Sequence, residues 1–320
     1  MAVLTLVENW EGNFKKTSFE AVCYGKKVAE KLGEKLITLV FGSADLSALQ
    51  DYGADKIINI TNLSFETTAN NIIAKISSDI IDEHQVNTII VSNTNNGKAI
   101  TPLLANTIGS GLITNAIEYP ENYSPLTIKC RVFSSKAYAK YKSTYQKNVI
   151  SIIPNSIGEL NPIPGTGEII KIEKNYDTST EHINIKNRHQ LSGKIPLSDA
   201  NIVVSAGRGL KNAENWAMIE ELAEVLGAGT ACSKPVSDMG WRPHSEHVGQ
   251  TGLAINPDLY IAIGISGAIQ HLAGVNSSKN IVVINTDPEA PFFKAANYGV
   301  VGDAFEFVPE LITALKKYKS

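Results

Sequence analysis

A repeated alternation between short apolar runs and longer amphipathic segments constrains the fold of this chain more than any other feature. The apolar runs have the length of buried strands, and the segments between them have the length of helices. Strands that alternate with helices form parallel sheets through right-handed crossovers. In the first part of the chain, strands are predicted at residues 2–7, 36–41, 55–60 and 88–92, and helices at 17–32, 66–82 and 96–108. We expect Thr17 and Glu20 to form a capping box at the first of these helices.

The pattern changes after residue 127 and returns after residue 200. An antiparallel or mixed extension of the first sheet is predicted from short strands at 129–132, 137–143, 148–153, 169–173 and 183–186. A polar segment with Gly193 and Pro196 follows, so we place a domain boundary between residues 191 and 192. The second alternation predicts strands at 202–205, 228–233, 259–266 and 280–285 and helices at 213–226, from 267 and at 308–317. The sequence therefore predicts an α/β protein of two Rossmann-like domains with mainly parallel sheets, residues 1–191 and 192–320.

Length and composition exclude several classes of protein. A chain of 320 residues is long for a single hydrophobic core, which agrees with two domains. Its net charge of −3 comes from 29 basic and 32 acidic residues, and neither half has the basic surplus of a nucleic-acid-binding domain. The three cysteines form no CxxC motif, which is typical of reduced structural thiols in the cytoplasm. We expect no signal peptide, no membrane-spanning segment and no nucleic-acid partner.

Two junctions in the second domain have the pattern strand, glycine, helix. At the first, Gly207 and Gly209 flank Arg208 directly after a predicted strand. Glycine lets the backbone approach a ligand, backbone N–H groups near a helix start attract anions, and arginine can pair with a phosphate. The same pattern is equally common as a plain turn, and it is not a complete GxGxxG.

At the second junction, we expect the strand to end at Ser266 and a helix to begin at Gly267. The Ser266 hydroxyl and the N–H groups of Gly267 and Ala268 would then face one point beyond the carboxyl end of the strand. Gln270 and His271 are expected one turn further along the helix, where a histidine is as often a buried structural residue as a ligand contact. Two junctions suited to phosphate in one small domain favour a dinucleotide.

The segment between these junctions contains His244 and His247. HxxH is a metal-ligand spacing, but Pro243 and the following glycines place it in a loop without a third ligand, so we predict no metal site. The next residues, VGQTG at 248–252, are small and polar, and they can present a hydroxyl and amides to a ligand.

These segments together identify a resemblance. SAGRGL at 205–210, CSKPVSDMGW at 232–241, HVGQTG at 247–252, LYIAIGISGAIQHLAG at 259–274 and NTDPEAPFFKAANYGVVGD at 285–303 resemble the FAD-binding domain of the electron transfer flavoprotein alpha subunit. The first domain resembles the family more loosely, in its layout and in TNNGKAITPLLA at 94–105.

The resemblance implies FAD in an extended conformation. It assigns Ser266 and the helix N–H groups to the pyrophosphate, Thr251 to flavin N5 and His271 to the O2 side. Lys234 stands where the family commonly has arginine; with Thr251 and His271 it is expected to tune the redox potential, Lys234 and His271 through positive charge. The complete set of expected cofactor contacts is Arg208, Ser233, Lys234, Val248, Gly249, Gln250, Thr251, Ser266, Gly267, Ala268, Ile269, Gln270, His271, Asn285 and Asp303.

The resemblance also implies a soluble, cytoplasmic electron carrier rather than an enzyme. The first domain would face a beta subunit that usually holds AMP. The heterodimer would take electrons from flavin dehydrogenases, such as the acyl-CoA dehydrogenases of fatty acid β-oxidation, and pass them to a membrane quinone reductase. Three alternatives stay open: a bifurcating flavoprotein that uses NADH and carries a second FAD on its beta subunit, an FAD- or NAD-dependent dehydrogenase with its own substrate, and a nucleotide-binding interaction module.

Overall fold

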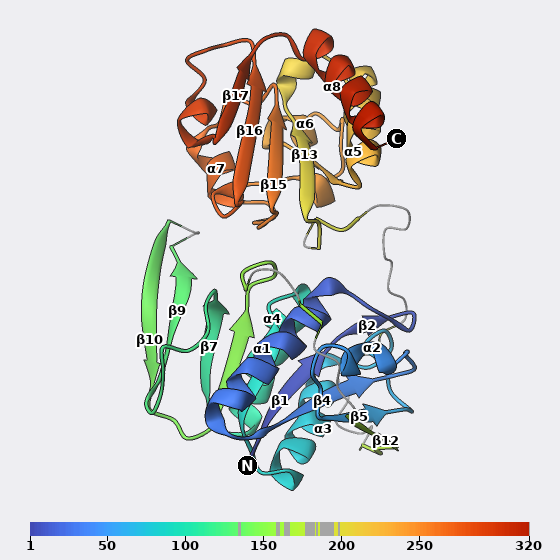
Figure 1. Cartoon of the computed structure of the whole chain (residues 1–320), viewed down its shortest axis with the longest axis vertical. Helices are drawn as coiled ribbons and strands as arrows, with labels where there is room; N and C mark the ends of the chain where they lie inside the picture. Colours follow the sequence, from blue (N-terminus) through green and yellow to red (C-terminus); the bar gives the residue numbers. More distant parts are fainter. Residues whose placement is uncertain are drawn as a thin grey trace. The chain divides into compact units, whose positions relative to one another are not determined.

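The computed structural model describes residues 1–133, 136–157, 161–162, 167–176, 183, 185, 195–197 and 199–319. They divide into two compact units, one of Met1–Val132 with Tyr138–Gln190 and one of Phe133–Ala137 with Leu191–Ser320 (Figure 1). Both units contain a mainly parallel sheet, which confirms the predicted α/β fold class. None of the helices in the described ranges combines the length and the apolar character needed to cross a lipid bilayer.

The first unit contains a sheet with the strand order β10-β9-β7-β11-β6-β1-β4-β5-β12, and β8 pairs with β9. These strands are β1 (Ala2–Val7), β4 (Lys35–Phe41), β5 (Lys56–Ile60), β6 (Val86–Ser92), β7 (Gly111–Ala116), β8 (Asn122–Tyr123), β9 (Leu126–Val132), β10 (Ala137–Ser143), β11 (Asn148–Ile152) and β12 (Glu168–Ile172). A separate antiparallel pair consists of β2 (Asn9–Trp10) and β3 (Asn13–Phe14). The helices are α1 (Lys16–Leu32), α2 (Ser47–Gln50), α3 (Asn70–Glu83) and α4 (Asn95–Thr107).

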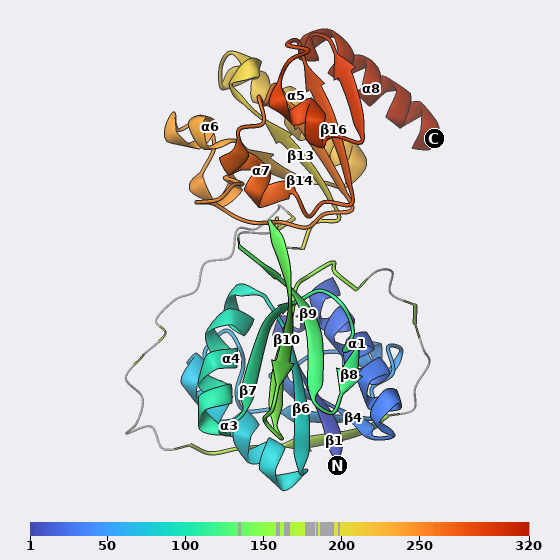
Figure 2. The same cartoon turned by 90° about the vertical axis from the view of Figure 1, so that its left-hand side faces the viewer.

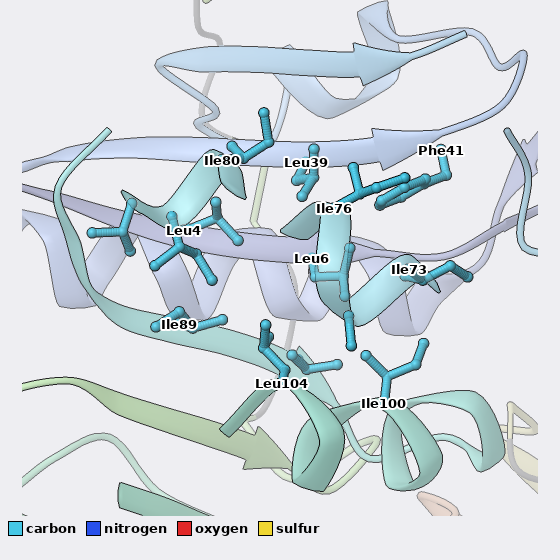
Figure 3. Close-up of a cluster of buried hydrophobic side chains, with 14 of the residues drawn as sticks. Leu4, Leu6, Leu39, Phe41, Ile73, Ile76, Ile80, Ile89, Ile100 and Leu104 are labelled. Carbon is cyan, nitrogen blue, oxygen red and sulfur yellow. The ribbon is translucent and has the colours of Figure 1, made fainter. Parts of the chain in front are cut away.

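Apolar side chains cover both faces of this sheet, because successive residues of a strand point to opposite sides. Leu4 and Leu6 of β1 pack with Leu39 and with side chains of α3 and α4 in one buried cluster (Figure 3). Val3 and Val7 belong to a second cluster with side chains of α1. Figure 2 shows α3 and α4 on one side of the sheet and α1 on the other. Continuous apolar runs therefore form the central strands.

The predicted capping box of α1 is wrong. The helix begins at Lys16, so Thr17 and Glu20 both lie inside it. Glu20 is fully buried, and its two carboxylate oxygens accept hydrogen bonds from the backbone N–H of Asn155 (3.1 and 3.0 Å). The Glu20 carboxylate therefore binds Asn155, 135 residues away in the chain, and does not cap the helix as its local spacing predicted.

The later strands of the first unit make the sheet mixed, as predicted, but β11 does not extend it at an edge. Strand β11 lies inside the sheet, parallel to β6 and β7, while β9 pairs antiparallel with β7 towards the edge of the sheet. Helix α3 begins at Asn70, four residues later than expected. Part of the predicted strand at 183–186 lies outside the described residues.

The second unit has a parallel sheet in the order β14-β13-β15-β16-β17 (Figure 1). Its strands are β13 (Ile202–Ala206), β14 (Gly229–Cys232), β15 (Leu259–Ile263), β16 (Asn280–Asn285) and β17 (Tyr298–Val301). Its α-helices are α5 (Ala217–Leu226), α6 (Lys234–Asp238), α7 (Ile269–Val275) and α8 (Ala304–Lys319). The short 3₁₀ helices are η2 (Arg208–Leu210), η3 (Glu214–Trp216), η4 (His244–Glu246) and η5 (Pro291–Ala295).

The order of connections in this sheet creates a switch point. From β13 the chain passes to β14 on one side and then to β15 on the other side of β13. Val204 and Ile261 face a core cluster that includes residues of α5 and α8, whereas Val203 and Tyr260 face the cluster that contains Val275 of α7. The loops that follow β13 and β15 therefore diverge, and a crevice at such a point is where open parallel sheets bind ligands.

Candidate functional site

Three glycines let the loops after β13 and β15 touch. The backbone N–H of Gly207 donates to the carbonyl oxygen of Ile263 (2.9 Å), and that of Gly209 donates to the carbonyl oxygen of Gly264 (3.1 Å). Gly264 has a φ of +60°, and a Cβ atom at Gly207 or Gly209 would collide with its backbone. The glycines therefore hold bare backbone together at the switch point.

A cavity of about 460 Å³ is lined by residues at and beyond the carboxyl ends of β13, β14, β15 and β16. Each of these strands ends in a loop that contributes to the wall, and the loop after η4 completes it. The lining residues are Gly207, Arg208, Gly209, Ser233, Lys234, Pro235, His247, Val248, Gly249, Gln250, Thr251, Gly264, Ile265, Ser266, Ala268, Gln270, His271, Asn285 and Asp287.

Backbone hydrogen bonds fix the loop after η4 to β14 and α7. The N–H of Val248 donates to the carbonyl oxygen of Cys232 at the end of β14 (3.1 Å). The N–H of Gln250 donates to the carbonyl oxygen of Gln270 in α7 (2.7 Å). The VGQTG segment is therefore held between two elements that themselves line the cavity, which explains how its small residues face a ligand.

An ion-pair network with a largely buried Arg242–Glu246 pair holds the same loop from outside the cavity. The Arg242 guanidinium donates two hydrogen bonds to the Glu246 carboxylate (both 2.7 Å) and one to Glu220 of α5 (2.9 Å). It also lies over the Trp216 ring, 5.2 Å from the centroid. Bidentate arginine–carboxylate pairs have a fixed geometry, so this network anchors the residue immediately before His247.

The predicted start of α7 at Gly267 is wrong by two residues. Strand β15 ends at Ile263 because Gly264 turns the chain, and the helix begins at Ile269. Gly267 has a φ of +84°, and a Cβ atom there would collide with the backbone of Phe292. As a consequence, the cavity-lining side chains of Gln270 and His271 lie in the first turn of α7.

Most of the site residues expected from the sequence converge on this cavity, and twelve of them are among its lining residues. Gly267, Ile269 and Asp303 are not. Gly267 packs against Phe292, the side chain of Ile269 is 61% exposed, and Asp303 accepts a hydrogen bond from the N–H of Phe305 at the start of α8 (2.9 Å). Contact with a cofactor stays a prediction for these three and for the twelve that line the cavity.

His271 is buried and lines the cavity as a neutral imidazole. Its Nε2 lies 2.8 Å from the hydroxyl of Tyr260, and its Nδ1 has no hydrogen-bond partner within the described part of the chain. Burial and the neighbouring His247 lower the pKa of His271 to about 4, against a weaker opposing effect of the Val248 carbonyl. The expected positive charge at His271 is therefore not supported at neutral pH, although the side chain can still form hydrogen bonds to a ligand.

Arg208 and Lys234 supply the positive charge of the site. Both side chains are exposed and line the cavity. No carboxylate in the described ranges forms a salt bridge with Lys234. An unpaired cation beside a cavity at a loop junction suits an anionic ligand group.

Sequence reasoning missed two charged or titratable residues of the wall, His247 and Asp287. His247 is 3% exposed, and burial, followed by the nearby His244, lowers its pKa. Its parallel bridge to Cys232 is non-local, and its sequence signal was its place at the start of the HVGQTG motif. Asp287 follows β16 by two residues, and its N–H donates to the Asn285 side chain (3.1 Å). Because Asn285 was expected in the site at the end of this strand, its position is the signal from which Asp287 could have been found.

In the first unit, a carboxylate of the chain itself occupies the start of helix α4. The Glu8 carboxylate accepts hydrogen bonds from Thr94 Oγ1 and from Asn96 Nδ2 (2.8 Å) at the beginning of α4. Thr94 caps the helix by accepting from the N–H of Gly97 (3.0 Å). A second anion at this point would face the charge of Glu8, which disfavours a nucleotide phosphate there.

The cavity residues fit an extended ligand with phosphate groups and a polar ring. The glycine contacts give backbone access at the switch point, Arg208 and Lys234 provide cations, and the unpartnered Nδ1 of His271 is available to a polar ligand atom. Among the described residues, no group of three His, Cys, Asp or Glu side chains could hold a metal ion. The site therefore matches a dinucleotide cofactor such as FAD.

Comparisons with known proteins agree with this chemistry. Residues 196–276 match the model of the electron transfer flavoprotein FAD-binding domain, and residues 3–176 match that of the electron transfer flavoprotein domain. FAD is thus the cofactor of the second unit. The chain is 34% identical to an electron transfer flavoprotein subunit alpha of Syntrophomonas wolfei, over 97% of this chain and 98% of that protein.

Two further relatives cover nearly the whole chain. An electron transfer flavoprotein subunit alpha of Bacillus subtilis is 35% identical over 98% of this chain and 97% of its own length. Protein FixB of Clostridium saccharobutylicum is 32% identical over 98% and 96%. With matches of this extent in both units and a cavity built from the motifs quoted above, the chain belongs to the electron transfer flavoprotein alpha subunit family.

Proposed function

We propose that this chain carries electrons between other redox proteins and has no substrate chemistry of its own. The observation that supports this most directly is the composition of the cavity wall. It contains two cations, two buried histidines with lowered pKa and a single carboxylate, Asp287. Such a wall can bind and electrically tune a flavin, which when bound supplies the redox chemistry.

In this proposal, the chain's own residues have three roles. Arg208, Ser266 and the backbone N–H groups near Ala268 bind the pyrophosphate, and Ser233, Asn285 and the segment from Val248 to Thr251 position the remainder of the cofactor. Lys234 contributes positive charge beside the ring, and Thr251 and His271 contribute hydrogen bonds. Gly267, Ile269, Gln270 and Asp303 complete the proposed set.

We also propose that the chain forms a heterodimer with an electron transfer flavoprotein beta subunit that holds AMP. The complex would take electrons from flavin dehydrogenases such as acyl-CoA dehydrogenases and pass them to a membrane quinone reductase. The buried free thiols of Cys23, Cys130 and Cys232 favour a reducing compartment such as the cytoplasm.

The test is electron transfer by the purified complex under anaerobic conditions. An acyl-CoA dehydrogenase and its substrate should reduce the flavin rapidly, whereas the acyl-CoA alone should not, because the carrier lacks a substrate site. Reduction by acyl-CoA without the dehydrogenase would contradict the carrier proposal. Direct reduction by NADH would favour the bifurcating type.

The phosphate role of Arg208 has its own test. Arg208→Ala should weaken FAD retention, because loss of a charged hydrogen-bond donor costs roughly 1.5–3 kcal/mol, or about ten- to a hundredfold in the dissociation constant. Lys211→Ala is the matched control, since that cation lies over the Phe305 ring, 4.7 Å from its centroid, and does not line the cavity. Equal flavin content in the two variants after the same dialysis would refute the assignment.

A further inference from the structure

A tyrosine outside the predicted site contacts the histidine inside it. Tyr260 of β15 is fully buried, and its hydroxyl lies 2.8 Å from Nε2 of His271. Phe292 packs edge-on against the His271 ring, with centroids 5.7 Å apart and planes at 72°. The imidazole is therefore held in place from two sides, and only one of these contacts is polar.

The protonation states of this pair limit how the hydrogen bond can form. Burial raises the pKa of the Tyr260 hydroxyl, so it keeps its proton, while burial and His247 lower the pKa of His271. A neutral imidazole has one N–H donor and one acceptor nitrogen. The remaining question is which nitrogen of His271 carries the proton.

We propose that Tyr260 donates to Nε2 of His271 and so holds the imidazole as its Nδ1–H tautomer, which presents Nδ1–H as a donor to an acceptor atom of the cofactor. Two observations favour this direction. Nδ1 is buried without a hydrogen-bond partner in the described residues, and the Tyr260 hydroxyl, which keeps its proton, lies within donating distance of Nε2. Tyr260 is then a positioning residue, because it acts on the ligand only through His271.

The proposal rests on the flavin site proposed above and adds a selectivity to it. A buried donor without an acceptor is unfavourable, and a ligand carbonyl oxygen at this point removes that cost. A ligand that offered an N–H group at the same point would leave two donors facing each other. The Tyr260–His271 pair thus selects for an acceptor atom on the bound ring.

The competing arrangement involves Ser205 on the neighbouring strand. Its hydroxyl lies beside that of Tyr260 and has no hydrogen-bond partner of good geometry among the described residues. If Tyr260 donated to Ser205 instead, it would accept from Nε2–H of His271, and Nδ1 would be an acceptor. The two arrangements differ in one measurable property, the tautomer of His271.

The test is nitrogen NMR of the full chain, purified as the complex it forms and labelled with ¹⁵N-histidine. His271→Gln identifies the His271 signals by their absence. At pH 7.5 the wild type should show a protonated Nδ1 and an unprotonated, hydrogen-bonded Nε2. Tyr260→Phe, which retains the ring, should shift the population towards the Nε2–H form, whereas Ser205→Ala should leave the tautomer unchanged.

Cofactor binding gives a second readout. Tyr260→Phe should weaken FAD binding roughly fivefold, the effect of one ordinary hydrogen bond, and in a His271→Gln background the same change should have no further effect. A wild-type Nε2–H tautomer, or an unchanged tautomer in Tyr260→Phe, would overturn the proposal. A wild-type complex that binds no flavin would overturn the proposed function instead, and the tautomer measurement would still stand.

Discussion

At the scale of single residues, Lys234 is the position where the resemblance leads us to expect an arginine. It keeps the charge of an arginine but loses the planar fork that stacks on a ring. Its side chain is exposed, so solvent screens its field strongly. Lys234 should therefore adjust the flavin potential rather than determine whether flavin binds.

Replacing Lys234 tests this role. Lys234→Met should make the flavin potential more negative by roughly 10–40 mV, because an exposed charge interaction is worth about 0.2–1 kcal/mol. Lys234→Arg should cause a smaller change, since the charge remains. Spectroelectrochemical titration measures both, with Lys279→Met, a residue paired with Asp258 away from the cavity, as the control. Wild-type potentials in Lys234→Met would show that Lys234 does not act on the ring.

His271 should give the second unit an acid-sensitive stability. Its pKa is about 4 in the fold and near 6.5 in an unfolded chain, so between these values the unfolded state binds a proton that the folded state does not. Unfolding free energy should thus fall as pH decreases from 6.5 to 4, by at most about 3.4 kcal/mol. Denaturant titrations of the flavin-free protein should show a weaker pH dependence for His271→Gln than for the wild type. Identical slopes would contradict the burial argument.

At the scale of elements, the loop after η4 depends on the Arg242–Glu246 pair. The side chains of these residues are 12% and 8% exposed, so removing one partner leaves the other charge buried without compensation. Arg242 also donates to Glu220 of α5, so the pair links that helix to the cavity wall without itself lining the cavity.

Breaking the pair should affect stability and cofactor retention together. Glu246→Gln is expected to destabilise the second unit by about 3 kcal/mol and to increase FAD dissociation. Lys316→Met is the matched control, because it breaks an ion pair to Glu221, which lies on α5 next to Glu220. The side chains of Lys316 and Glu221 are 57% and 50% exposed. Such a surface pair is worth under about 1 kcal/mol. Similar unfolding midpoints for the two variants would argue against the anchoring role.

The sequence predicted elements better than it predicted their ends and partners. Buried parallel strands carry strong apolar runs, so β1, β4, β13 and β16 could be located from local pattern alone. The end of β15 could not be located in this way, because the turn at Gly264 depends on its contact with Gly209 after the neighbouring strand. Glu20 had the spacing of a capping residue, but its carboxylate accepts a hydrogen bond from the N–H of Asn155 instead. The cavity wall was predictable for most residues of the motifs. His247 was not assigned to the wall, although it begins the HVGQTG motif, because its place depends on pairing with Cys232.

At the scale of the whole molecule, exposed aromatic side chains on the first unit suggest an incomplete assembly. Tyr138 and Tyr141 on the edge strand β10, and Tyr145 just after it, are 62%, 48% and 60% exposed. Aromatic residues of this exposure are common in protein interfaces. They agree with a partner subunit.

Expression without a beta subunit tests this dependence. The chain alone should be poorly recovered or should lose FAD, because its apolar surface and cofactor site lack their proposed cover. Co-expression with an electron transfer flavoprotein beta subunit should restore both yield and flavin content. A stable monomer with full flavin occupancy in size-exclusion chromatography would contradict the heterodimer.

The place of β11 within the first sheet has a consequence for synthesis on the ribosome. Residues 148–152 form a strand that separates β6 from β7, so the sheet cannot close when β7 has emerged from the exit tunnel. Until then, both of these earlier strands keep an unpaired edge, and that of β6, which is rich in isoleucine and valine, is prone to pair with other chains. The nascent chain therefore passes through an interval, between the emergence of residues 116 and 152, in which chaperone binding would protect it most.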